Sequence, residues 1–287
     1  MPLSPSRFSC RGRAVVAAAV CCAALLPAAG AWATPVPTSV PAPGPAPAAA
    51  ETAALPAPYA RWQSSMDAFA AADQAGLPQA GGVLFVGSST IRLWTDLRED
   101  FRQLPVVINR GFGGSTMADC NYFVKRLVLQ YRPRQVIVYA GDNDLAEGRS
   151  PAQVLESLRS FAGTVRTELP DTRISYVSIK PSPLRSALLP RIREANALIA
   201  DYLSGVPGTD YIDIFSPMMA ADGQPRAELF GPDRLHMNAA GYDLWQSAIR
   251  PYLQEEQAPM PQMQADAVPA PASPVVAGQG LVAGSRP

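Results

Sequence analysis

The sequence has a single histidine, His236, and only four cysteines among its 287 residues. Cys10, Cys21 and Cys22 all fall near the start of the chain, so Cys120 stands alone in the remainder. One histidine and one such cysteine do not supply the ligands of a zinc site, which argues against a zinc hydrolase. Any reaction that needs an imidazole base must therefore use His236, and Cys120 on its own cannot form an intramolecular disulfide.

Several motifs of other enzyme classes are also missing. There is no Gly-x-Ser-x-Gly sequence, which disfavours the ordinary α/β-hydrolase arrangement. There is no Walker lysine motif, and the glycines of residues 111–114 do not complete the dinucleotide-binding fingerprint. The only lysines are Lys125 and Lys180, and the arginines are scattered without interleaved aromatic residues. A nucleic-acid partner is therefore not expected.

The amino-terminal segment has the pattern of a secretory signal. Its first 13 residues carry three arginines and no acid, an Ala-rich and Val-rich stretch follows, and small residues flank Trp32. This pattern predicts a signal peptide over residues 1–33, cleaved after Ala33, and a secreted or periplasmic protein. An uncleaved membrane anchor over residues 14–33 is the alternative. The cleaved chain would have 21 basic and 24 acidic residues, a net charge of −3.

Two further stretches have the composition of unfolded linkers. Residues 34–58 and 256–287 are rich in proline and alanine, which at this density opposes helices and sheet ladders. We predict that both are disordered and that one folded domain occupies residues 59–255.

Inside that domain, short apolar runs alternate with amphipathic helical patterns. The predicted strands lie at residues 83–86, 106–109, 135–139, 173–179 and 211–215. The predicted helices lie around residues 62–75, 120–131, 151–169, 191–203 and 239–253, with capping residues at Ser150 and Asn238. Such alternation is typical of an α/β protein with a parallel sheet covered on both faces. Functional sites in these sheets form at the carboxyl ends of the strands.

Four segments at that expected edge carry the groups that acyl transfer needs. Ser89 follows the first strand, and the glycine-rich residues 111–115 follow the second. Asn143 follows the third strand, and Asp233 and His236 lie in the loop after the fifth. A serine nucleophile requires a base, a carboxylate that orients the base, and donors aimed at the oxyanion. Each residue taken alone has an ordinary structural interpretation, for example as a turn or cap residue, but the four segments together favour a catalytic site for acyl transfer.

These segments resemble the four sequence blocks of the SGNH or GDSL-type hydrolases, a family of esterases. The resemblance covers essentially the whole predicted domain. It implies a flavodoxin-like three-layer α/β/α sandwich with a five-stranded parallel sheet and no cofactor. It also implies that Ser89 is the nucleophile, His236 the general base and Asp233 the residue that orients the imidazole. The implied oxyanion donors are the backbone N–H groups of Ser89 and Gly114 and the side-chain amide of Asn143.

One position departs from the family pattern, because Ser88 stands where the family usually has aspartate. The nucleophile and its N–H are retained, so activity is still expected. Asp144 is interpreted as a structural residue that binds loop backbone, and Cys120 as a small buried apolar residue.

The combined hypothesis is a secreted serine esterase that acts on a short-chain acyl ester, an acetylated glycan or a lysophospholipid. One alternative is an O-acyltransferase that uses the same triad to acylate envelope sugars. Another is a non-catalytic module that binds the envelope. No stable membrane insertion is expected after cleavage of the signal, and the sequence does not indicate an oligomeric state.

Overall fold

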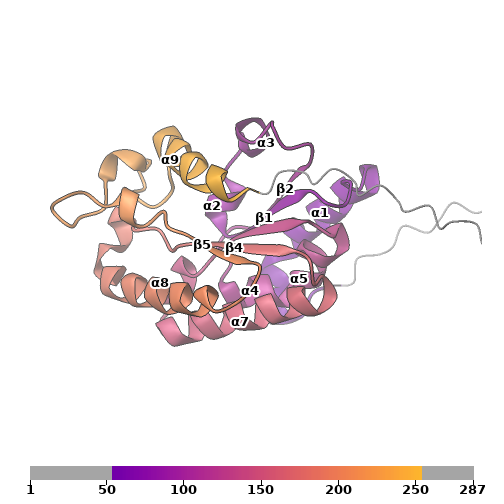
Figure 1. The fold of residues 1–287 in the computed structure, drawn as a ribbon, viewed down its shortest axis with the longest axis horizontal. Helices are drawn as coiled ribbons and strands as arrows, with labels where there is room; N and C mark the ends of the chain where they lie inside the picture. Colours follow the sequence, from indigo (N-terminus) through magenta and orange to yellow (C-terminus); the bar gives the residue numbers. More distant parts are fainter. Residues whose placement is uncertain (1–53, 254–287) are drawn as a thin grey trace, which may run out of the picture. The chain divides into compact units, whose positions relative to one another are not determined.

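The computed structural model describes residues 54–253, which contain a sheet of five parallel strands (Figure 1). The strands are β1 (Val83–Gly87), β2 (Val107–Gly111), β3 (Gln135–Tyr139), β4 (Arg173–Val177) and β5 (Thr209–Ile212). Their order across the sheet is β2-β1-β3-β4-β5, and each neighbouring pair is parallel. This is the strand order of flavodoxin-like sheets, so the predicted fold class is confirmed.

The central strands are buried on both faces. Every residue of β1 and β3 is buried, which explains why both read as continuous apolar runs rather than alternating ones. Leu84 and Val86 of β1 join one apolar cluster, whereas Val83 and Phe85 join the other. Side chains alternate along a strand, so the two clusters are the two faces of the sheet. The protein therefore has two cores with the sheet between them.

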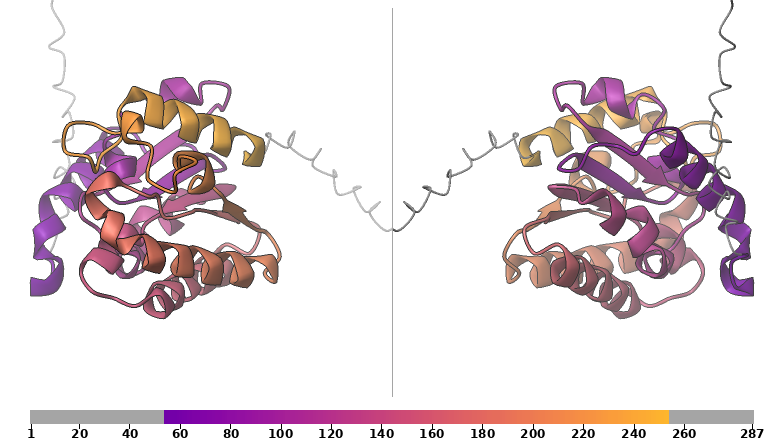
Figure 2. Two further views of the ribbon diagram at one scale, coloured as in Figure 1. Left: turned by 90° about the vertical axis from the view of Figure 1, so that its left-hand side faces the viewer. Right: turned by 90° about the vertical axis from the view of Figure 1, so that its right-hand side faces the viewer.

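Helices cover both faces (Figures 1 and 2). The larger core lies under α1 (Gln63–Ala75), α4 (Met117–Tyr122), α5 (Val124–Leu127), α7 (Pro151–Glu168) and α8 (Leu189–Ser204). The smaller core lies under α2 (Ser89–Arg92), α3 (Leu97–Asp100) and α9 (Ala239–Ile249). The remaining segments are α6 (Asp142–Ala146) and the 3-10 turns η1 (Ala57–Trp62), η2 (Leu129–Tyr131), η3 (Pro183–Leu188), η4 (Ser216–Met218), η5 (Ala227–Leu229) and η6 (Arg250–Tyr252). The three-layer sandwich expected from the sequence is present.

Polar residues at the helix starts explain where several helices begin. Ser150 accepts a hydrogen bond from the Gln153 N–H, and the Gln153 side chain accepts from the Ser150 N–H in return. Asn238 caps α9 by accepting from the Gly241 N–H at 3.2 Å. Each cap satisfies backbone donors that the first turn of a helix leaves free. Both caps were predicted from the sequence, and both are confirmed.

Two predicted strands end earlier than the sequence indicates. The fourth strand stops at Val177 rather than at residue 179, and the fifth spans Thr209–Ile212 rather than residues 211–215. The Ser178 hydroxyl accepts from the Ile214 and Phe215 N–H groups at 3.0 Å each, which takes this backbone out of the sheet ladder. Ile214 and Phe215 are apolar because they are buried in the core after the strand has ended.

The predicted helix over residues 120–131 is interrupted. Its apolar stripe is buried as expected, but the backbone divides into α4, α5 and η2. Phe123 and Val128 have non-helical dihedral angles at the two breaks. The apolar pattern predicts which side chains face the core, and an interrupted helix satisfies that pattern as well as a continuous one.

Several predictions concern residues outside the described range. The signal peptide over residues 1–33, most of the first linker and the tail from residue 256 all lie there. Residues 54–58, which the sequence assigned to the linker, are described, and the Leu55 N–H donates to Gln63 Oε1 at 2.8 Å. Within residues 54–253, no helix has the length and apolar character needed to cross a membrane.

Candidate active site

Ser89 is the first residue of α2, and only Ser88 separates it from the end of β1. β1 lies between β2 and β3 in the sheet. The strand order reverses between β1 and β3, and ligand crevices form at such a reversal in parallel sheets. Gly87 permits the turn, because it has a φ of +147° and an added Cβ would lie 1.8 Å from the Tyr139 carbonyl oxygen. The Ser88 N–H donates to that oxygen at 3.0 Å. The turn thus delivers the Ser89 hydroxyl to the carboxyl edge of the sheet.

The Ser89 hydroxyl lies in a hydrogen-bonded line with His236 and Asp233. His236 Nε2 lies 2.9 Å from Ser89 Oγ, and His236 Nδ1 lies 2.6 Å from Asp233 Oδ2. One imidazole thus has the hydroxyl at one nitrogen and the carboxylate at the other. These are the contacts that a serine nucleophile, its base and an orienting carboxylate require. The three predicted catalytic residues are brought together, although 147 positions separate Ser89 from His236.

A tight turn holds Asp233 in place. Its Oδ1 accepts from the backbone N–H groups of Leu235 and His236 at 3.0 Å each. Arg234, which lies between Asp233 and Leu235, has a φ of +57° in the left-handed region. These backbone donors, first that of Leu235, together with the imidazole, lower the pKa of Asp233 from 3.8 to about 2. Asp233 therefore stays ionised at neutral pH, and its half-exposed side chain is consistent with the charged form.

The Gly113–Gly114 peptide is anchored by an aromatic side chain. Trp62 Nε1 donates to the Gly113 carbonyl oxygen at 2.9 Å. In a trans peptide the following N–H points away from that carbonyl, so the anchor directs the Gly114 N–H to the other side. Gly114 has a φ of +74°, which favours glycine. Among residues 54–253 no partner is seen for the N–H of Gly114 or of Ser89.

The Asn143 amide is bound at both ends. Its Nδ2 donates to the Ser115 carbonyl oxygen at 2.9 Å, and its Oδ1 accepts from Arg185 Nη2 at 2.8 Å. The amide nitrogen has two hydrogens, and the bond to Ser115 uses only one of them. Asn143 thus sits beside the glycine-rich loop with one N–H still available.

The comparisons with known proteins agree with this geometry. A model of the "GDSL-like Lipase/Acylhydrolase family" matches residues 72–244, more than half of the chain. The chain belongs to this family. The match confirms the resemblance to GDSL-type ester hydrolases that the four sequence blocks indicated.

Similar proteins are known by sequence and by structure. Esterase TesA from Pseudomonas aeruginosa is 28% identical to this GDSL-like hydrolase over 125 residues, which are 41% of this chain and 59% of TesA. The chain thus spans less than two thirds of that relative. A GDSL-like lipase from Bacteroides thetaiotaomicron aligns with a TM-score of 0.58 at 21% identity over 65% of this chain and 96% of that chain. An acetylxylan esterase from Geobacillus stearothermophilus aligns with a TM-score of 0.51 at 14% identity over 60% of this chain and 94% of that chain.

A buried cluster of charges lies behind the site of this GDSL-like hydrolase. Lys180 Nζ is 3.1 Å from Asp142 Oδ2 and also 3.1 Å from the hydroxyl oxygens of Thr90 and Tyr139. Arg185 Nη1 reaches the same Asp142 oxygen at 3.0 Å. Burial alone would raise the pKa of Asp142, but the two cations outweigh it and hold the pKa below its usual value. Asp142 is therefore the anion of the cluster.

Sequence reasoning did not single out Lys180 or Arg185. Both follow β4 at the same sheet edge as the other site segments. This position was the one feature of the sequence that could have indicated that they lie near the site. Trp62 was assigned to a helix face, and its contact with Gly113 was not expected. All three residues act through contacts between positions at least 38 apart in the chain.

Two residues near the site have the structural character predicted for them. Asp144 Oδ2 accepts from the Met117 N–H at 2.9 Å, and burial raises the pKa of Asp144 to about 6. Cys120 is fully buried, and burial raises the pKa of its thiol. Among residues 54–253, no group of three or more His, Cys, Asp or Glu side chains is placed to hold a metal ion.

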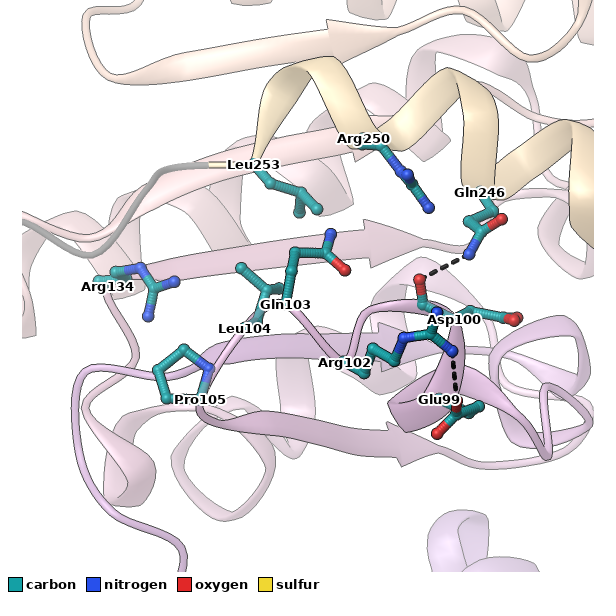
Figure 3. Close-up of a pocket in the computed structure, with 10 residues that line it drawn as sticks. All are labelled: Glu99, Asp100, Arg102, Gln103, Leu104, Pro105, Arg134, Gln246, Arg250 and Leu253. Carbon is teal, nitrogen blue, oxygen red and sulfur yellow. Dashed lines mark hydrogen bonds and ion pairs between the residues drawn. The ribbon is translucent and has the colours of Figure 1, made fainter.

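An open cavity of about 820 Å³ lies elsewhere (Figure 3). Its walls include Pro105 and Arg134, which precede β2 and β3, so it lies towards the amino ends of these strands. Ser89 and His236 lie at the opposite edge, where the strands end. Several side chains that line the cavity are already bonded, such as Gln246 to the Asp100 carbonyl oxygen and Arg102 to Glu99. The cavity is therefore not the catalytic site.

Proposed function

We propose that this GDSL-like hydrolase is an exported serine esterase that cleaves short-chain acyl esters, with acetylated glycans as the favoured substrate class. The observation that carries the catalytic part is the contact of His236 with both Ser89 Oγ, at 2.9 Å, and Asp233, at 2.6 Å. This line of contacts supports Ser89 as nucleophile, His236 as base and Asp233 as the group that orients the imidazole.

In the proposed reaction, Ser89 Oγ bonds to the ester carbonyl carbon while His236 Nε2 takes the hydroxyl proton. Asp233 stays ionised and stabilises the imidazolium. The tetrahedral oxyanion accepts hydrogen bonds from the N–H groups of Ser89 and Gly114 and from the Asn143 amide. The C–O bond to the alcohol then breaks, and His236 gives its proton to the leaving oxygen. Water, deprotonated by His236, attacks the acyl-enzyme and releases the acid and free Ser89.

The openness of the site supports a hydrated substrate. The side chains of His236 and Asp233 are 31% and 51% exposed, so a bulky alcohol can approach the triad. The sequence segments beside the motifs contain no long apolar lid, which favours small acyl groups. The similarity to an acetylxylan esterase, whose fold this chain shares, is consistent with an acetyl group on a glycan.

Export is proposed from the sequence alone. Residues 1–33 have the basic start, apolar middle and small-residue end of a signal peptide, and proline-rich residues follow them. An exported esterase would meet esters of the envelope or of external polymers. Cell fractionation and amino-terminal sequencing of the mature chain test this point, with residue 34 expected as the first residue.

Labelling with a fluorophosphonate tests the nucleophile. We expect one adduct per chain, mapped by peptide mass spectrometry to Ser89, and slow labelling of His236→Ala because the base is absent. An adduct on another serine, or equal labelling rates, would contradict the proposal.

A second experiment distinguishes a hydrolase from an acyltransferase. When a xylo-oligosaccharide is added during turnover of p-nitrophenyl acetate, a hydrolase releases acetate, whereas a transferase yields an acetylated sugar.

A further inference from the structure

The Asn143 amide has partners of opposite kind at its two ends. Arg185 Nη2 donates to Oδ1 at 2.8 Å, and Nδ2 donates to the Ser115 carbonyl oxygen at 2.9 Å. A guanidinium can only donate and a carbonyl can only accept. Rotating the amide by half a turn would bring donor against donor and acceptor against acceptor. Arg185 therefore permits only the orientation in which the amide nitrogen faces the glycine-rich loop.

Arg185 is itself firmly placed. Its Nη1 lies 3.0 Å from Asp142 Oδ2, and Asp142 is buried. The preceding residue, Leu184, donates its N–H to the Arg234 carbonyl oxygen at 3.0 Å, which joins this segment to the turn that carries Asp233 and His236. The guanidinium therefore has a fixed relation to Asn143 and to the catalytic turn.

Neutralising Asp142 does not require Arg185. Lys180 already contacts the same carboxylate oxygen at 3.1 Å. A second cation on one carboxylate adds little to the pairing, since desolvating each further charge is costly. Among residues 54–253, no other side chain donates to Asn143 Oδ1, so the contact that Arg185 alone makes is its hydrogen bond to Asn143.

We propose that Arg185 is a positioning residue that fixes and polarises the Asn143 amide for the oxyanion. The proposal rests on the role of Asn143 as an oxyanion donor in the proposed function. A charged donor on Oδ1 draws electron density from the amide and strengthens its N–H groups as donors. A donor that is already aligned also needs no reorganisation when the oxyanion forms.

A double-mutant cycle tests this role. We expect Arg185→Met to lower kcat by about tenfold to a hundredfold with KM within about threefold of wild type. In the Asn143→Ala background, the same change should cost no more than about twofold, because its target is gone. The kcat of Arg185→Lys should be intermediate, because the lysine ammonium lacks the planar guanidinium that contacts both Asn143 and Asp142. Arg193→Met is the matched control, because Arg193 is exposed and stacks on Phe215.

Binding of a trifluoromethyl ketone provides a second readout, because its adduct with serine carries an oxyanion. Its affinity should fall with Arg185→Met by the same factor as kcat/KM. A wild-type kcat for Arg185→Met, or additive losses with Asn143→Ala, would overturn the proposal while leaving the esterase in place. Full activity of Ser89→Ala would instead overturn the proposed function. Circular dichroism and calorimetry of each variant would show whether it is folded, and Arg185→Met is expected to fold because Asp142 keeps Lys180.

Discussion

Replacing Lys180 with methionine tests the charge cluster behind the nucleophile. The side chain of Lys180 is 1% exposed, and its ammonium has three oxygen neighbours at 3.1 Å, on Asp142, Thr90 and Tyr139. Methionine has nearly the same length and fills the space without a charge. The change therefore removes the electrostatic contribution and leaves the packing largely unchanged.

The expected loss of stability from each substitution depends on which buried charges keep a counter-ion. Lys180→Met leaves the Asp142 carboxylate with Arg185 Nη1 at 3.0 Å, so no lone charge is buried. Asp142→Asn leaves two cations together without their anion. Leaving a buried charge without any counter-ion lowers the free energy of unfolding by roughly 3–5 kcal/mol. Removing one of two counter-ions lowers it by about 1–3 kcal/mol. We therefore expect Asp142→Asn to be the more destabilising change.

Urea unfolding followed by circular dichroism measures both free energies of unfolding, and calorimetry gives the shift in Tm. For a domain of this size each kcal/mol corresponds to roughly 2–4 °C. Arg102→Met is the control, because Arg102 and Glu99 form an exposed ion pair at 2.7 Å that contributes less than about 1 kcal/mol. If Lys180→Met costs as much as Asp142→Asn, or if both match the control, the reasoning about the cluster is wrong.

Three further predictions concern the site. Asn143→Ala should lower kcat by about a hundredfold or more through loss of an oxyanion donor, and a value within about twofold of wild type would remove that role. Trp62→Phe keeps an aromatic ring but loses the N–H that anchors Gly113, so kcat should fall roughly threefold to tenfold, whereas an unchanged kcat would show that the anchor is dispensable. Asp233 has its pKa lowered from 3.8 to about 2, so its contribution to stability is present above about pH 4 and is lost as the pH falls through about 2. The difference in Tm between wild type and Asp233→Asn, measured by calorimetry against pH, should therefore shrink over this interval, and a difference as large at pH 2 as at pH 5 would contradict it.

Much of the fold is predictable from local sequence. The third strand has the predicted bounds, Gln135–Tyr139, because all its residues are buried and its apolar run is easy to recognise in the sequence. Ser150 and Asn238 mark helix starts because capping depends on nearby backbone groups. The fifth strand is displaced because the Ser178 hydroxyl competes for the backbone of residues 214 and 215. That competition is a tertiary contact, which strand propensity does not register.

The contacts among Ser89, His236 and Asp233 were predictable because these residues match the family's sequence blocks and because His236 is the only histidine in the chain. The residues that contact the proposed oxyanion donors were not. Trp62 reaches Gly113 across 51 positions, and Arg185 reaches Asn143 across 42. Neither contact leaves a periodic pattern in the sequence. A polar residue that acts only through a distant partner becomes visible once the fold brings the two together.

Hydrolysis of p-nitrophenyl acetate and butyrate by the purified protein tests the central claim most directly. Wild type is compared with Ser89→Ala and His236→Ala, each shown by circular dichroism to have the same fold. The account predicts turnover by wild type, faster with acetate than with butyrate, and loss of nearly all activity in both variants. Turnover that survives in Ser89→Ala, or a wild-type protein that is as inert as the variants, would contradict it.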